Sequence, residues 1–136
     1  MNNPVDLIGL SFGKNFSILD AYTLGLQEQT LTVVAANQSV GKTQICENFA
    51  MYQAIELNEP ILWFSLEMDK DRMTFRNLAI LSGIDCTAIM TGNITNEQSQ
   101  LLNQCAIKLL QSQFYLSERG HDLSEALAIA RRYVQA

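Results

Sequence analysis

Residues 36–43 combine the residue types that a loop needs in order to hold a polyphosphate. They fit the phosphate-loop pattern, with Ala36 in place of the first glycine. Successive backbone N–H groups of such a loop surround an anion, and Gly41 allows a close approach that a Cβ would obstruct. Lys42 can extend its ammonium to the outer phosphates, and the Thr43 hydroxyl can take one coordination position on Mg²⁺. We interpret this loop as a site for a nucleoside triphosphate and Mg²⁺. Its residues are Ala36, Asn37, Gln38, Ser39, Val40, Gly41, Lys42 and Thr43.

The alternative is that Gly-Lys-Thr is an ordinary polar turn before a helix. From average residue usage, about one chain in a hundred of this length would match the pattern by chance. Fewer would carry it between a predicted strand and a predicted helix, as this sequence does. Its position therefore favours the phosphate-binding interpretation.

The position of the loop depends on the secondary-structure elements on either side of it. Residues 30–36 are β-branched and continuously apolar at their centre, which predicts a strand covered on both faces. Residues 42–57 predict a helix, with one apolar face formed by Ile45, Phe49, Tyr52 and Ile55. The amino end of that helix would add about half a positive charge to the loop.

Strands and helices continue to alternate along the rest of the chain. Further strands are predicted at residues 61–66 and 113–117, with a helix at 69–81 between them. A capping box at Thr95 and Gln98 predicts a long helix with an apolar stripe, and a last helix starts near Asp122. The stripe comprises Leu101, Leu102, Cys105, Leu109 and Leu110, and the last helix is expected to bury Leu123, Leu127, Ala130 and Val134. This order predicts an α/β fold with a mainly parallel sheet.

Glu67 is the candidate catalytic side chain beyond the loop. Ligands of open α/β sheets lie at the carboxyl ends of the strands, so a residue that leaves the second strand can face the same crevice as the loop. A carboxylate there could orient or deprotonate the water that attacks a terminal phosphate. A solvated acid beside the next helix start is an equal alternative on these grounds alone.

Amino-acid composition favours a globular protein and argues against zinc-binding, disulfide-rich and membrane-spanning proteins. The chain has 136 residues, 48% of them hydrophobic, and a formal charge of -5, which predicts one globular domain without general attraction to nucleic acid or anionic membranes. Its cysteines, Cys46, Cys86 and Cys105, have the spacing of neither a zinc site nor a disulfide framework, so we expect reduced, buried thiols. No apolar run approaches the length of a membrane helix, and we expect a cytoplasmic protein without membrane association.

The loop together with Phe64-Ser-Leu-Glu-Met68 resembles the RecA-like motor domain of replicative DNA helicases of the DnaB type. Phe16-Ser-Ile-Leu-Asp20, Arg76 and Thr91-Gly92 are similar to further motifs of that family, and the likeness covers almost the whole chain. The resemblance implies a three-layer P-loop NTPase fold, with residues 1–29 as a lead-in segment and residues 30–136 as the core. It also implies an ATP-dependent helicase that uses ATP and Mg²⁺, with catalytic roles for Lys42 and Glu67 and a metal-ligand role for Thr43.

The chain also departs from the family pattern. It has Asn37-Gln38 where the family commonly has Arg-Pro. Neither Asp85 nor Asp122 replaces the family's Mg²⁺-associated aspartate, which belongs to a strand that we expect beyond residue 136, so the fold would be incomplete at its carboxyl end. The resemblance implies DNA contacts through regions absent from this chain, a homo-hexameric ring, and a primase or helicase loader as partner. We therefore expect the isolated chain to bind nucleotide weakly and not to unwind DNA.

Two other functions stay open at this point. One is a different P-loop enzyme, such as a small kinase or another RecA-like ATPase, although the Ser-Leu-Glu-Met sequence argues against the kinase. The other is a non-catalytic nucleotide-binding module that joins or regulates a helicase ring. Capture of an intact helicase by the chain would favour the second.

Overall fold

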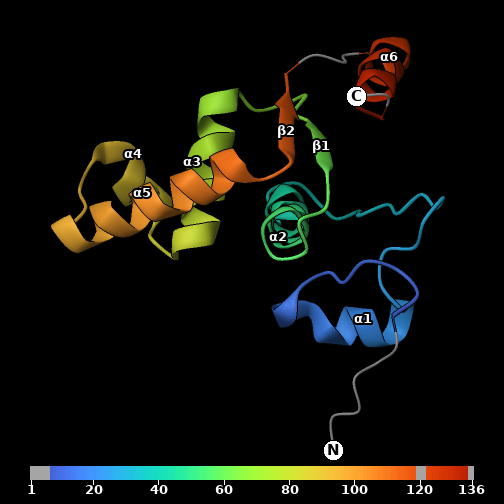
Figure 1. Cartoon of the computed structure of the whole chain (residues 1–136), viewed down its shortest axis with the longest axis horizontal. Helices are drawn as coiled ribbons and strands as arrows, with labels where there is room; N and C mark the ends of the chain where they lie inside the picture. Colours follow the sequence, from blue (N-terminus) through green and yellow to red (C-terminus); the bar gives the residue numbers. More distant parts are fainter. Residues whose placement is uncertain (1–6, 119–121, 135–136) are drawn as a thin grey trace, which may run out of the picture. The chain divides into compact units, whose positions relative to one another are not determined.

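The computed structural model describes residues 7–118 and 122–134, and the chain divides into two compact units, Met1–Glu59 and Pro60–Ala136. The first unit contains a 3₁₀ helix, η1 (Lys14–Phe16), and the helices α1 (Ser17–Thr23) and α2 (Lys42–Ile55). The second contains β1 (Ile61–Phe64), α3 (Lys70–Ser82), α4 (Cys86–Thr91), α5 (Asn96–Gln111), β2 (Phe114–Ser117) and α6 (Leu123–Val134) (Figure 1). The fold is α/β, as predicted.

Asp20 organises the lead-in segment of the first unit. This buried carboxylate on α1 accepts hydrogen bonds from Ser11 Oγ at 2.6 Å and from the Phe12 backbone N–H at 2.9 Å. The helix ends at Leu24, which has a left-handed φ of 61°, and an antiparallel bridge then joins Leu10 to Leu26. The segments before and after α1 are therefore tied to each other.

Gly9 lies next to this bridge, against the backbone of Leu26. A Cβ built on Gly9 would come within 2.1 Å of the Leu26 carbonyl oxygen. Because that atom belongs to the backbone, it cannot move aside as a side chain could. We expect Gly9→Ala to lower the free energy of unfolding by more than about 2 kcal/mol in urea titrations followed by circular dichroism.

Gly92→Ala provides the matched control for that variant. Gly92 has a positive φ of 72°, but a Cβ there would have no atom within 4 Å. Its replacement should cost only about 1 kcal/mol, from backbone strain alone. Equal destabilisation by the two variants would contradict the close approach at Gly9.

The strand predicted at residues 30–36 is wrong. These residues have no regular secondary structure, and all of them are exposed, Leu31 by 89% and Val33 by 74%. A strand exists only when its backbone groups are paired with a neighbouring strand. The sheet of the described residues has two strands, β1 and β2, and neither pairs with this segment.

The buried face of α2 also differs from the prediction. Phe49 is buried, where it contacts Phe12 and Phe16 edge-on at centroid distances of 4.8 Å. The other three predicted residues, Ile45, Tyr52 and Ile55, are half-buried. The least exposed positions are Glu47, Met51 and Ala54, each at 1%. Because α2 has apolar residues on more than one side, spacing alone did not identify the face that packs most closely.

The two described strands form a parallel pair, as predicted. Figure 1 shows β1 and β2 side by side. Ile61 is paired with Phe114 and Phe64 with Ser117. The strand predicted at residues 61–66 is shorter than expected, because β1 ends at Phe64 and Leu66 is 62% exposed. The connection between the strands runs through α3, α4 and α5, and α3 contacts both of the other helices.

Helix starts in the second unit follow the sequence signals closely. The Asp69 carboxylate accepts from the Arg72 N–H and begins α3, and Gly83, with a φ of 70°, ends it. The capping box of α5 is confirmed, since Thr95 and Gln98 each bond to the backbone N–H of the other. The short helix α4 was not predicted, although Asp85 before it and Gly92 after it are typical end residues.

The apolar stripes of α5 and α6 are less buried than predicted. On α5, Cys105 is buried and Leu102 and Leu109 are half-buried, but Leu101 and Leu110 are exposed. On α6, Leu123 is 76% and Leu127 47% exposed, Ala130 is half-buried, and the side chain of Val134 lies outside the described residues. Amphipathic spacing shows which face could be covered, whereas burial requires a neighbouring element at that face.

Two further expectations concern the membrane and the cysteines. No helix among the described residues has the length and apolar character needed to span a bilayer.

Cys46, Cys86 and Cys105 are free thiols, as expected, but only Cys105 is buried. Partial burial, together with the nearby Glu47 carboxylate, raises the pKa of Cys46. The Cys46 thiol is therefore protonated at neutral pH, which does not suit a nucleophile.

Candidate functional site

The loop from Ala36 to Gly41 turns sharply before it enters α2. Ser39 has a φ of 61° and Gly41 a φ of 100°, both in the left-handed region. A Cβ on Gly41 would have only Gln44 Oε1 nearby, at 4.0 Å, so backbone conformation favours glycine here more than lack of space does. This geometry directs the chain into the first turn of the helix.

The amino end of α2 has no side-chain cap. Its first backbone hydrogen bond runs from the Ile45 N–H to the Gly41 carbonyl at 3.0 Å, so the helix itself provides no acceptor for the preceding N–H groups. The other described helices of similar length are capped at this end by oxygen atoms of Asp69, Thr95 and Asp122. The start of α2 thus combines uncapped donors with the positive end of the helix dipole, which suits an anion.

Lys42 closes the loop with its ammonium. Its Nζ donates to the Ala36 carbonyl at 2.9 Å and to the Asn37 carbonyl at 3.0 Å. These bonds span five and six residues along the chain, so the ammonium lies beside the start of the loop while its backbone is the first residue of α2. A concentrated positive charge is thereby held against the same loop as the uncapped N–H groups.

The loop is open to ligands. Residues 36–41 are exposed, and Lys42 and Thr43 are half-buried. Among the described residues, no three His, Cys, Asp or Glu side chains gather closely enough to hold a metal ion. Asp85 and Asp122 accept the backbone N–H groups of Ala88 and Glu125 and so serve as helix caps. A metal ion at this loop would depend on the Thr43 hydroxyl, phosphate oxygens and water.

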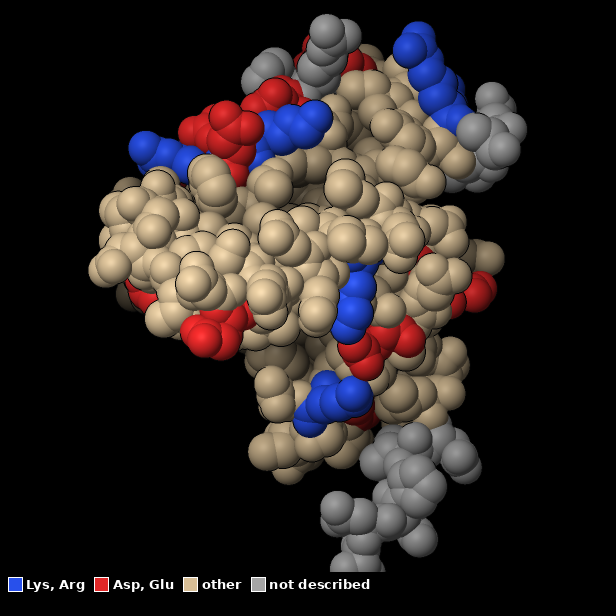
Figure 2. All heavy atoms as spheres, turned by 60° about the vertical axis from the view of Figure 1, so that its left-hand side comes forward, with Lys and Arg blue, Asp and Glu red and all other residues tan. Residues whose placement is uncertain are grey.

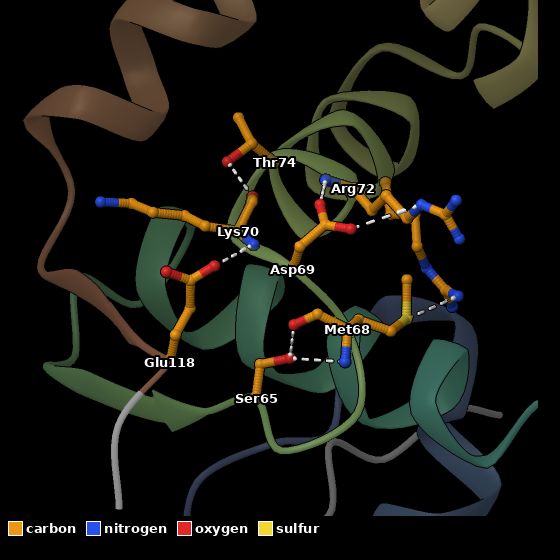
Figure 3. Close-up of polar contacts among 8 residues, drawn as sticks. Ser65, Met68, Asp69, Lys70, Arg72, Thr74 and Glu118 are labelled. Carbon is orange, nitrogen blue, oxygen red and sulfur yellow. Dashed lines mark hydrogen bonds and ion pairs between the residues drawn. The ribbon is translucent and has the colours of Figure 1, made fainter.

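Glu67 lies in a tight turn at the carboxyl end of β1. The buried Ser65 bonds through its hydroxyl to both the N–H and the carbonyl of Met68 (Figure 3). Ser65 also donates its own N–H to the Ser117 carbonyl at 2.9 Å, next to the end of β2. Leu66 and Glu67 are exposed between these anchors. The Glu67 carboxylate is therefore presented to solvent from a turn that is fixed at its base.

Sequence reasoning missed the two residues that hold this turn to its surroundings. Ser65 was included in the predicted strand, although a serine just past a buried run is a recognisable turn former. Glu118, after β2, accepts a hydrogen bond from the Lys70 N–H at 2.6 Å, which no local pattern indicates (Figure 3). Glu118 and Lys70 are 48 positions apart.

The predicted site residues fall into two groups. The structure brings Ala36 to Thr43 together around the start of α2, in the first unit, and places Glu67 in the second unit. The pairing of Glu67 with the loop stays a prediction. On the face drawn in Figure 2, several Lys and Arg side chains lie beside Asp and Glu side chains.

Comparison with known proteins identifies the family. The model of the DnaB-like helicase C terminal domain matches residues 10–136, and the chain belongs to this family. A replicative DNA helicase DnaC of Bacillus subtilis is 35% identical over 135 residues, which cover 98% of this chain and 29% of that protein. The resemblance found in the sequence motifs is thereby confirmed.

Two other relatives match shorter stretches. A replicative DNA helicase DnaB of Pasteurella multocida is 43% identical over 86 residues, covering 63% of this chain and 18% of that protein. A replicative DNA helicase DnaB of Geobacillus stearothermophilus is 32% identical over 117 residues, covering 86% of this chain and 25% of that protein. The chain thus spans less than a third of the length of each of these relatives.

Proposed function

We propose that residues 36–43 bind ATP together with Mg²⁺. The observation that carries this proposal is the start of α2, where uncapped N–H groups, the helix dipole and the Lys42 ammonium converge on one exposed loop. The backbone of Ala36, Asn37, Gln38, Ser39, Val40 and Gly41 would surround the phosphates. Lys42 would contact the outer phosphates, and Thr43 would be a ligand of the metal ion.

The proposal extends to the architecture around the loop. Residues 30–136 would form a RecA-like P-loop core of three layers, preceded by the lead-in segment of residues 1–29. Support comes from the family match and from the parallel pairing of β1 with β2, which a P-loop sheet requires. Glu67, presented in the turn after β1, would be the carboxylate that activates water for attack on the terminal phosphate.

The activity of the complete machine would be duplex DNA unwinding coupled to ATP hydrolysis. Support comes from the matched relatives, which are replicative DNA helicases. We propose a homo-hexameric ring with ATP held between neighbouring subunits, acting on DNA and served by a primase or a loader. The acidic net charge of -5 is consistent with DNA contacts confined to particular segments.

Removal of the Thr43 hydroxyl tests nucleotide binding and the metal role together. Valine matches threonine in shape but has no oxygen ligand. We expect Thr43→Val to weaken binding of ATP in the presence of Mg²⁺ by about 10-fold, and to leave binding without Mg²⁺ unchanged. Titration calorimetry of the chain with and without Mg²⁺ measures both affinities.

Thr87→Val is the matched control, because Thr87 is an exposed residue of α4, far from the loop in sequence. It should bind ATP as the unaltered chain does under both conditions. No heat of ATP binding to the unaltered chain would overturn the proposed function. An equal loss with and without Mg²⁺ would refute the metal role of Thr43.

A further inference from the structure

Glu118 joins two segments of the second unit that are distant in sequence. It follows β2 directly, and its Oε1 accepts a hydrogen bond from the backbone N–H of Lys70, the first residue of α3, at 2.6 Å. The Lys70 carbonyl in turn accepts from Thr74 Oγ1 at 2.8 Å (Figure 3). Both the N–H and the carbonyl group of Lys70 are therefore hydrogen-bonded to side chains.

This contact completes a set of side-chain anchors around one turn. Ser65 bonds to both backbone groups of Met68, and Asp69 accepts the Arg72 N–H at 2.8 Å. Glu118 accepts the N–H of Lys70, which lies between these two contacts in the sequence (Figure 3). The residues between the anchors are few, and Glu67 is among them. The path of the backbone that carries Glu67 is thus defined at both ends.

Glu118 does more than cap α3. Asp69 already provides the local cap of this helix, and its Oδ2 lies 3.4 Å from Arg72 Nε as an ion pair. Glu118 takes a different donor and comes from the end of the neighbouring strand. A carboxylate is favoured at a helix amino end, and a charge-assisted hydrogen bond is stronger than a neutral one. The contact therefore fixes the end of β2 to the turn after β1.

The same contacts make the start of α3 less suited to an anion than the start of α2. With the N–H groups of Lys70 and Arg72 already bonded to carboxylates, the start of α3 does not offer the donors that α2 offers. Its negative groups would also repel phosphate.

We propose that Glu118 is a positioning residue that holds the turn bearing Glu67. For the hydrolytic role of Glu67 this inference rests on the proposed function. A general base must lie within hydrogen-bond distance of the water it activates, and small displacements reduce rates strongly. The Glu118 contact with Lys70 limits such displacement without touching the nucleotide.

Two variants of Glu118 separate the hydrogen bond from the charge. Glu118→Gln retains an oxygen acceptor for the Lys70 N–H, whereas Glu118→Ala removes it. In ¹H–¹⁵N spectra of the chain, we expect Glu118→Ala to shift the amide signals of residues 66–68 and to speed hydrogen exchange at Lys70 about 10-fold or more. Glu118→Gln should leave both nearly unchanged. Glu28→Ala removes another exposed carboxylate, in a turn of the first unit, and is the control.

Hydrolysis distinguishes positioning from a general loss of structure. In the assembled ring of the complete protein, with protein in excess over ATP, we expect Glu118→Ala to lower the maximal rate of hydrolysis about 10-fold while the half-saturating protein concentration changes less than about twofold. Glu118→Gln should restore the rate. Unchanged amide signals in Glu118→Ala, or a parallel loss of nucleotide affinity, would overturn the inference. A chain that binds no ATP would instead overturn the proposed function, and the amide signals would still decide whether Glu118 holds the turn.

Discussion

Lys42→Ala is expected to abolish ATP binding by the chain. Lys42 is the residue whose ammonium lies against the loop, with Nζ at 2.9 and 3.0 Å from the Ala36 and Asn37 carbonyls. Alanine removes the charge-assisted bonds to phosphate as well as these two bonds that close the loop. At about 1.5–3 kcal/mol for each hydrogen bond to a charged group, the affinity should fall more than about 100-fold. Titration calorimetry with ATP and Mg²⁺ would then show no binding.

Lys108→Ala separates this effect from a simple change in net charge. Lys108 is exposed on the last turn of α5, in the second unit. Its removal changes the charge equally and should leave the affinity for ATP within about twofold. Circular dichroism spectra of both variants would establish that α2 still forms. Retention of full affinity by Lys42→Ala would refute the assignment of the loop.

Glu67→Gln is expected to stop hydrolysis while nucleotide binding persists. Glutamine has the shape of glutamate but cannot take a proton from water. A positioned general base contributes about 10²- to 10⁴-fold to the rate, and this factor should be lost. Because Glu67 is exposed in its turn, the substitution should not disturb folding. Single-turnover hydrolysis by the assembled ring of the complete protein, at excess protein, measures the rate, and calorimetry measures the affinity.

Asp71→Asn is the matched control for Glu67→Gln. Asp71 is an exposed acid in the first turn of α3, four residues further along the chain. It should retain the rate of the unaltered chain. Equal rates in Glu67→Gln and the unaltered chain would show that another group activates the water, and the loop assignment would still be decided by Lys42→Ala.

Local signals predicted the helix starts well. Asp69 and the Thr95–Gln98 pair bond to N–H groups three residues away, so residue type and spacing alone determine whether the contact can form. The candidate loop could be located for the same reason. Its residues are contiguous, and the Lys42 contacts with Ala36 and Asn37 span no more than six residues.

Apolar patterns predicted elements less well. Residues 30–36 and 61–66 were both predicted to be buried strands, yet only the second segment contains a strand, Ile61–Phe64, which is paired with β2 and half-buried. Likewise, the apolar face of α6 was expected to be buried, and Leu123 is 76% exposed. An apolar pattern indicates that burial of the segment would lower its free energy. It does not say whether another segment is there to cover it.

The amino-acid sequence by itself determined the position of the candidate loop before α2, the starts of α3 and α5, and the two segments that become parallel strands. These features depend on contacts between near neighbours or on strongly apolar runs. Only the tertiary structure decided that residues 30–36 stay exposed and that Glu118 reaches the Lys70 N–H, 48 positions away. Strand pairing and long-range hydrogen bonds depend on which distant segments meet, and no short sequence pattern encodes that.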